Sequence, residues 1–313
     1  MQLRLFVAGS KLDRFLVSKT TLASLIGLIA VALAQPGATQ DLAGDGVSTV
    51  KHRFIATAAN EFRCGDEVFR LADIAPFSLD DPSQKSRQTE DGQKRLQAFL
   101  DKNLISIDKV GYTDRWGRTV IYVYYTDKIV FGLSQTNTND GGGCPLVEDL
   151  QGPTLQDRLV SAGAVMVAPE TEYASQIRQL LVYEWRAHKA LAGGWAAQNS
   201  LRLAAKEAEG AIGRVSIVCG EALSVADIRG RMYINFGEDY REDFTITLRS
   251  ADFKKWRRQQ RIADISPGDQ LCARGFVLWI NGPSITVDHP QQIERRYAED
   301  ENYQYKDTRA PLR

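Results

Sequence analysis

The chain has 313 residues, of which 43% are hydrophobic and 25% are charged, and its 39 basic side chains balance its 39 acidic ones. This composition is typical of a globular protein, and the length is sufficient for two hydrophobic cores. The balance excludes the basic surplus that drives nonspecific binding to nucleic acid, so a nucleic-acid function would have to depend on a local patch.

Residues 1–34 have the pattern of a secretory signal. Four basic side chains precede an apolar run of 15 residues, Thr20 to Ala34, which ends in a small-x-small cleavage site before Gln35. An uncleaved membrane anchor is the alternative, but this run is shorter than the roughly 20 apolar residues that a spanning helix needs. We therefore expect export to the periplasm or the outside of the cell and no membrane span in the mature chain. Cleavage would leave residues 35–313 with a formal charge of three negative.

A first domain is expected over residues 48–197, after a linker at 35–47. Its strands are indicated by β-branched and aromatic runs, and its helices by apolar residues at helical spacing. An insertion rich in Thr, Asn and Gly at 134–152 carries Cys144. The order strand, strand, helix, strand, strand suits a five-stranded barrel of the OB type, with one further strand that the sequence places poorly. The expected elements are strands at 50–57, 68–74, 105–110 and 119–125, a turn at 60–66, a loop at 78–90, and helices at 92–102, 155–162 and 171–190.

Two segments of this domain place an arginine beside an apolar run. One reads Val-Phe-Arg-Leu-Ala-Asp-Ile-Ala-Pro-Phe over 68–77, and the other contains Asp-Arg-Trp-Gly-Arg over 114–118. Together they resemble the staphylococcal nuclease (thermonuclease) family, in which an "R-L-x-G-I-D-x-P-E" segment and a "D-x-x-G-R" turn carry two arginines that clamp a scissile phosphate. An "L-V-x-x-G" segment at 159–163 and an "E-x-x-A…G-x-W" ending at 184–195 extend the likeness over residues 48–197.

The resemblance implies a phosphate-binding role for Arg70 and Arg118. Arginine suits this task because its planar guanidinium binds two phosphate oxygens at once. A structural role is the alternative, since an arginine on a strand often pairs with a nearby carboxylate, and Asp114 is close in sequence.

The acids that the family uses for catalysis are absent from their expected positions. The segment that matches the first calcium site, 54–60, has no acidic residue, and Phe77 occupies the position of the glutamate that orients water. Asp73 is one residue out of register with the second calcium aspartate and is only a weak metal candidate. Asp66 and Glu67 belong to the preceding turn. The resemblance therefore implies a degenerate site with no cofactor, and calcium is expected only if the chemistry has diverged.

A second domain is expected over 198–294, and its order of elements again suits an OB-type barrel. The fold class expected for the chain is thus α+β, mainly β, with two five-stranded barrels. The segments 233–237 and 243–245 are similar to a domain appended to some exported thermonuclease-like proteins. Residues 295–313 are charged, lack an apolar period and are expected to form a disordered tail. The expected elements are helices at 199–209 and 251–261 and strands at 214–224, 231–236, 243–248, 270–280 and 285–287.

The chain has four cysteines and three histidines, without a C-x-x-C pair. A zinc site or a Cys/His nucleophile would need a tighter cluster. An even number of cysteines in an exported chain instead predicts disulfides. One pair within each domain gives Cys64–Cys144 and Cys219–Cys272, the second on neighbouring strands.

The helix expected at 251–261 carries basic side chains around Trp256. Basic residues around an aromatic ring can hold a phosphate backbone and stack a base. A solvated helix face with the tryptophan in the core is the commoner arrangement for such a run. The candidate contacts to nucleic acid are Lys254, Lys255, Trp256, Arg257 and Arg258.

The sequence therefore predicts an exported binding or scaffolding protein whose nuclease chemistry is lost, and whose ligand is a phosphate-bearing molecule such as nucleic acid, or a protein. The alternative is a divergent secreted calcium-dependent endonuclease acting on DNA or RNA, in which Asp73, Asp66 or Glu67 binds the metal. The two hypotheses differ in whether a carboxylate lies in the space between Arg70 and Arg118.

Overall fold

The computed structural model describes residues 53–77, 82–126, 144–147, 150–197, 201–239 and 241–295. These ranges belong to one compact unit, Ser48–Arg313. The expected signal at 1–34, the linker at 35–47, most of the insertion at 134–152 and the expected tail beyond Arg295 lie outside the described residues. What we predicted for these segments, and the predicted boundary between the two domains, therefore stay predictions.

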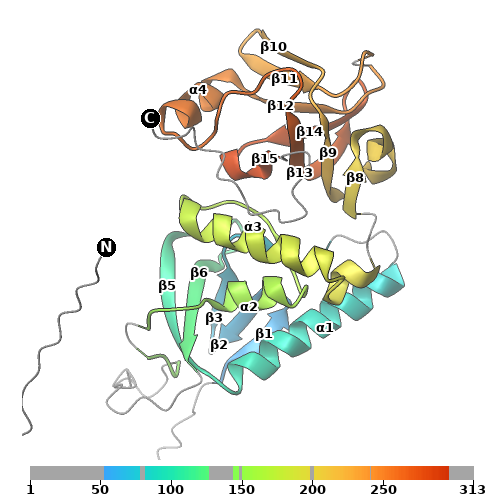
Figure 1. The fold of residues 1–313 in the computed structure, drawn as a ribbon. Coiled ribbons are helices and arrows are strands. Elements are labelled where there is room, and N and C mark those ends of the chain that lie inside the picture. Colours follow the sequence, from blue (N-terminus) through green and yellow to red (C-terminus); the bar gives the residue numbers. More distant parts are fainter. Residues whose placement is uncertain are drawn as a thin grey trace, which may run out of the picture. The chain divides into compact units, whose positions relative to one another are not determined.

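The first half of the described chain, up to Ala192, contains a five-stranded sheet with the order β1-β2-β3-β6-β5 (Figure 1). β3 and β6 are parallel, and the other neighbours are antiparallel. Inward residues such as Phe62 and Phe69 alternate with outward ones, as expected for a sheet with one buried face. A short pair of β4 and β7 lies beside it. The strands are β1 Ile55–Ala58, β2 Glu61–Cys64, β3 Glu67–Leu71, β4 Ile74–Ala75, β5 Leu104–Thr113, β6 Thr119–Thr126 and β7 Met166–Val167.

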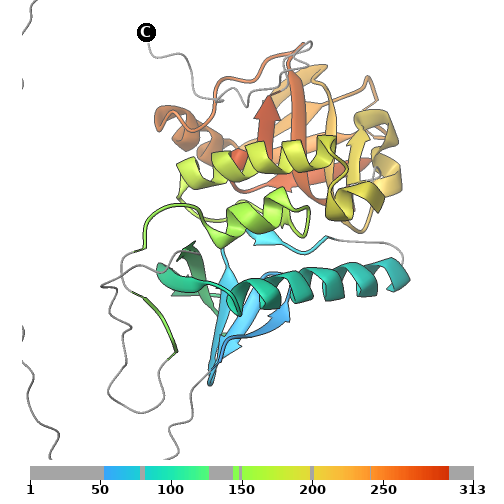
Figure 2. The same cartoon turned by 60° about the horizontal axis from the view of Figure 1, so that its bottom comes forward.

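Three helices pack on this half. Figure 2 shows α1, Pro82–Leu100, running along β1, where Gln97 hydrogen-bonds to the backbone of Phe54 and Ala56. α2, Leu155–Ser161, begins at a capping box formed by Thr154 and Asp157. α3, Ala174–Lys189, buries Ile177, Leu180, Leu181, Glu184 and Ala187.

The second half contains an eight-stranded sheet with the order β10-β11-β12-β14-β13-β9-β8, in which β15 also pairs with β13. It surrounds a separate core that includes Phe244, Trp256 and Ile285. The elements are β8 Arg202–Ala204, β9 Val215–Glu221, β10 Ser224–Ile228, β11 Arg231–Asn235, β12 Thr245–Arg249, α4 Ser250–Arg258, β13 Gln270–Trp279, β14 Pro283–Val287, β15 Ile293–Arg295, and 3₁₀ helices at Gly193–Ala197, Ala205–Ala211 and Pro290–Gln292.

The mixed, mainly β fold class agrees with the structure, but several expected elements were wrong. The expected loop at 78–90 contains the start of α1, because a polar sequence indicates exposure rather than the absence of a helix, and proline is tolerated in a helix's first turn. The expected turn at 60–66 contains β2. The Ala-rich segment 199–209 forms β8 and a 3₁₀ helix, since pairing with β9 overrides helix propensity.

The second sheet has eight strands rather than the five expected. β8 and β15 were missed because each has only three residues, and β10 was missed although it is as long as β11; pairing partners fix all three as strands. In the first sheet, β1 and β5 are the two edges among the described residues, so the observed pairings leave this sheet open.

Both expected disulfides are present. Cys64 and Cys144 have their Cα atoms 5.9 Å apart, and Cys219 and Cys272 have theirs 4.0 Å apart. The second pair lies directly opposite on β9 and β13, the neighbouring strands on which it was expected. Within the described ranges, none of the helices has the length and apolar character needed to cross a membrane.

Candidate functional site

Arg70 and Arg118 lie side by side. Arg70 is on β3 and Arg118 immediately precedes β6, and these two strands pair in parallel. On β3, Phe69 and Leu71 point into the core, so the intervening Arg70 points outward. Arg118 follows the turn between β5 and β6. The Asp114 carboxylate accepts hydrogen bonds from the backbone N–H groups of Trp116 and Arg118, which fixes this turn.

The same Asp114 carboxylate joins the two arginines. Its Oδ2 atom accepts a hydrogen bond from Arg70 Nε at 3.1 Å and from Arg118 Nε at 2.7 Å. The two terminal nitrogens of Arg70 bind Glu170 at 2.6 and 2.8 Å, and Arg118 Nη1 binds Glu61 at 2.5 Å. Two guanidinium groups are therefore surrounded by three carboxylates, which gives the network one net negative charge.

The pKa shifts in this network follow from its pairing. Burial raises the pKa of Asp114, but the hydrogen bonds and charge of Arg118 outweigh it and lower this pKa to about 2. Burial lowers the pKa of Arg70, and the interactions with Glu170 and Asp114 reverse this and raise it. Burial, followed by the charge of Glu170, raises the pKa of Tyr112 to about 12. Asp114 and the two arginines are thus held in their charged forms.

Asp73 is hydrogen-bonded to Glu170, and its carboxylate is already fully used. It is buried, has a left-handed backbone with φ of 58°, and accepts four hydrogen bonds. Oδ1 receives the N–H groups of Glu170 and Thr171 at 2.7 and 2.9 Å, and Oδ2 receives the hydroxyls of Thr171 and Tyr122 at 2.6 and 2.5 Å. This geometry argues against the metal role considered for Asp73, because the carboxylate holds the 170–171 segment instead.

The structure separates the other candidate acids from the arginines. Glu67 pairs with Lys109 at 3.2 Å, and Asp66 is exposed in the turn between β2 and β3. Over the described ranges, His, Cys, Asp and Glu do not form a group of three or more that could hold a metal ion.

Phe77, at the position expected for the catalytic base, is part of the core. Its ring packs edge-on against Trp195 at 5.1 Å between centroids. Gly194 allows this contact, because a Cβ atom there would lie 2.5 Å from the Phe77 ring. The residue is 6% exposed and faces away from the arginine pair's pocket, whose lining does not include it.

Glu170, like Glu61, is a site residue that sequence reasoning missed. It lies 100 residues after Arg70, in an Ala-Pro-Glu segment that follows β7. The pairing of β4 with β7 brings this segment beside Asp73, whose backbone N–H donates to Glu170 at 3.1 Å. The Pro-Glu dipeptide before a helix was a local signal for this segment. The long-range pairing of β4 with β7, which brings Glu170 to Arg70, could not be predicted from the sequence.

An open pocket of about 730 Å³ lies at this network. Its charged residues are the arginine pair, Arg115, Asp114 and Glu170, and its apolar wall includes Pro76 and Pro169. Trp116 stands at the rim with 65% of its surface exposed. The guanidinium carbons of Arg115 and Arg118 lie 4.0 and 4.7 Å from the centre of its ring, which are cation–π distances.

No protein-family model matches this chain, and no curated protein sequence matches it. The functional argument therefore depends on the geometry of the site.

The basic helix does not form a stacking platform. Trp256, one of the candidate contacts to nucleic acid, is 5% exposed and lies in the second core, so its ring is not available to a base. Lys254 pairs with Asp227, and Arg257 pairs with Asp264. Lys255 and Arg258 are exposed, so the four basic side chains of the set lie on the solvated face of α4. On β6, Tyr122 is likewise buried.

Proposed function

We propose that the chain is an exported, noncatalytic relative of thermonucleases whose first half binds a protein ligand at the pocket beside Trp116. The observation that carries this proposal is the Asp114 bridge. Because one ionised carboxylate occupies both arginines and Glu170 fills the remaining fork of Arg70, a phosphate group would have to displace acids held at 2.6 to 3.1 Å.

The surroundings favour a protein over a nucleic acid. Arg115 brings the charge of the arginine network to zero, so the site has no basic surplus that would attract a polyanion. The pocket instead combines an exposed tryptophan, two prolines and Arg115, for which the described residues supply a ring contact but no carboxylate. Tryptophan and arginine are the residues that most often dominate the energy of protein interfaces. This combination supports a ligand with an apolar segment and an acidic group.

The proposal includes OB-type architecture in both halves. In the first, the order β1-β2-β3-β6-β5 with one parallel pair is the strand order of that barrel. In the second, β9 and β10 are separated by two residues, and they pair with β13 and β11 respectively. If β9 and β10 are treated as one bent strand, that strand pairs with both β11 and β13. The five strands β9/β10, β11, β12, β14 and β13 would then form a closed barrel. The paired disulfides agree with an oxidising compartment and support export.

Site-specific photo-crosslinking tests the binding proposal. A photoreactive amino acid at Trp116, introduced in the cell of origin, is expected to give a discrete crosslinked protein. Trp279, which is 54% exposed elsewhere on the molecule, is the matched control position and should not give the same product. Crosslinks to nucleic acid, or identical products at both positions, would contradict the proposal.

The Asp114 bridge is tested by opening it. Asp114→Asn keeps the carbonyl oxygen that caps the turn but removes the charge that holds both arginines. We expect calorimetric titration with inorganic phosphate to give no heat with the unmodified protein and about millimolar binding with the variant. Asp108→Asn, which removes one charge from β5, is the control for net charge. Phosphate binding by the unmodified protein would show that the arginines are free.

A divergent nuclease is the second candidate, and Glu170 is the observation that favours it. Glu170 lies in the pocket against Arg70 and provides the carboxylate that the sequence position of Phe77 lacks. This candidate requires calcium-stimulated hydrolysis of single-stranded DNA by the purified chain, lost in Glu170→Gln. We expect no hydrolysis above background, because the described residues offer no metal cage.

A further inference from the structure

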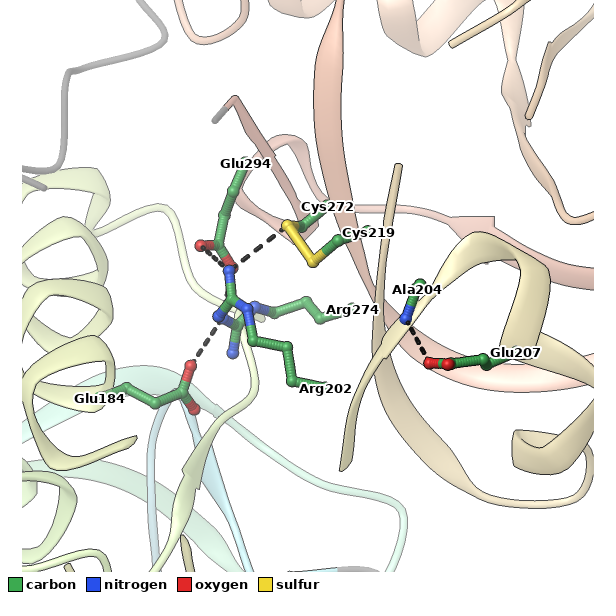
Figure 3. The surroundings of a disulfide bond; sticks show 8 residues. All are labelled: Glu184, Arg202, Ala204, Glu207, Cys219, Cys272, Arg274 and Glu294. Atoms are coloured by element: carbon green, nitrogen blue, oxygen red, sulfur yellow. Dashed lines mark hydrogen bonds and ion pairs between the residues drawn. A yellow bond between two sulfur atoms is a disulfide. The ribbon is translucent and has the colours of Figure 1, made fainter. Parts of the chain in front are cut away.

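The second disulfide lies beside a cluster of buried charges (Figure 3). Arg202 from β8, Arg274 from β13, Glu184 from α3 and Glu294 from β15 meet there, and their charges sum to zero. Arg274 is the better satisfied arginine, since it binds Glu184 at 2.7 Å, Glu294 at 2.5 Å and the carbonyl of Val167 at 2.9 Å.

Arg202 is held differently. Its side chain is 8% exposed, and its nearest carboxylate oxygen belongs to Glu294 at 3.9 Å. Its Nε atom, like that of Arg274, has no hydrogen-bond partner among the described residues. One terminal nitrogen instead lies 3.3 Å from Cys272 Sγ. A neutral disulfide sulfur is a weak acceptor, so this guanidinium lacks a full anionic partner as long as the disulfide is intact.

The two sulfurs of the disulfide are therefore not equivalent. Cys272 is fully buried and contacts the guanidinium, whereas Cys219 is 7% exposed. Thiol–disulfide exchange is faster when the departing sulfur is a stabilised thiolate, and it also requires access to the sulfur that is attacked. Both requirements select Cys219 as the attacked atom and Cys272 as the leaving group.

We propose that Cys219 is a site of reversible modification by small thiols, and that Arg202 directs the reaction by stabilising the Cys272 thiolate. In the first step an external thiolate bonds to Cys219 Sγ, the sulfur–sulfur bond breaks, and its electron pair leaves on Cys272 Sγ. A second external thiol then attacks the mixed disulfide at the sulfur of the first, which releases Cys219 as a thiolate and yields the oxidised external disulfide.

The first disulfide supplies a contrast within the same chain. Cys144 Sγ contacts the carbonyl oxygen of Cys64 at 3.6 Å, and among the described residues a guanidinium is not in contact with either sulfur. A carbonyl oxygen does not stabilise a thiolate, so this bond lacks the feature that assists exchange at Cys219–Cys272.

The experiment measures which sulfur reacts and how fast. The folded protein is exposed to glutathione, free thiols are trapped with iodoacetamide at intervals, and peptides are mapped by mass spectrometry. The expected early product has glutathione on Cys219 and the alkyl group on Cys272. Glutathione on Cys272, or reaction only under unfolding conditions, would overturn the proposal.

Variants at position 202 separate charge from packing. Arg202→Gln is expected to slow exchange about three- to tenfold, the effect of raising the leaving thiol's pKa by about one unit. Arg202→Lys should retain much of the rate, because it keeps the charge. In the reduced proteins, the pH dependence of Cys272 alkylation should show a higher thiol pKa for Arg202→Gln. Equal rates and equal pKa values in variants that keep the native circular dichroism spectrum would overturn the assigned role of Arg202.

Discussion

The molecule contains two arginine–carboxylate networks that differ in their access to solvent. At the pocket, Arg70 and Arg118 keep 13% and 23% of their side chains exposed and share Asp114. At the junction of the two halves, Arg274 and its partners Glu184 and Glu294 are each less than 5% exposed. In the first network, carboxylates neutralise two arginines that solvent can partly reach. The second satisfies charges that have no access to water, so its loss leaves an uncompensated buried charge.

The largest expected effect comes from breaking the buried network. Arg274→Met should lower the free energy of unfolding by about 3–5 kcal/mol, because it leaves two buried carboxylates without their shared cation. Denaturant titration measures this change. Arg257→Met is the control, since its pair with Asp264 is exposed and should contribute less than about 1 kcal/mol. Similar losses in both variants would mean that the burial difference between the networks has no energetic consequence.

Asp73 provides an intermediate case, because it is hydrogen-bonded to Glu170 of the pocket network but is itself buried. Asp73→Asn should destabilise the protein by about 2–3 kcal/mol, since an amide NH₂ would meet the donors that now bind the carboxylate. Asparagine tolerates the left-handed backbone at this position, so the change isolates the hydrogen bonds. Thermal unfolding checks the prediction against Asp66→Asn in an exposed turn, and equal melting temperatures would contradict it.

The pocket network should show its contribution in acid. Asp114 has a folded pKa of about 2, lower than its ordinary value of 3.8. A lowered pKa stabilises the folded state above the unfolded pKa and ceases to do so as the pH falls through the folded pKa. After solvent screening, the loss between about pH 4 and pH 2 should be about 1 kcal/mol. Urea titrations at several pH values test this, and Asp114→Asn should lose that part of the pH dependence.

The smallest stability effect is expected at the pocket's rim. Trp116→Ala should change the free energy of unfolding by less than about 0.5 kcal/mol, because the ring is mostly exposed and contributes little to either core. The same variant should abolish crosslinking of the proposed protein ligand from a photoreactive residue at Arg115. A large loss of stability would show that Trp116 is structural, and undiminished crosslinking would place the ligand elsewhere.

Sequence reasoning recovered the features that depend on local pattern. The strands β3 and β6, the Asp114 turn and the helices α2 and α3 follow from apolar periodicity and turn chemistry. The disulfide between Cys219 and Cys272 followed from counting cysteines and placing them on neighbouring strands. Short strands such as β2 and β15 were missed because three or four alternating residues do not make a pattern of their own.

The candidate site was recovered only in part for the same physical reason. Arg70, Arg118 and Asp114 are close in the sheet register, and their pairing was an open alternative from the sequence. Glu170 reaches Arg70 from 100 residues away through the contact between β4 and β7, each only two residues long. Burial also decided two questions that composition left open, namely whether Phe77 takes part in the arginine site and whether Trp256 can stack on a base. Both are core residues.

The position of Glu294 in the chain has a consequence for biosynthesis. Arg274 lies on β13, but one of its two carboxylate partners belongs to β15, the last described strand, which pairs with the start of β13. A ribosome-bound chain that has not yet released residue 294 contains Arg274 without this partner, and its second core lacks Ile293. The second half therefore completes its folding only after residue 294 has left the ribosome.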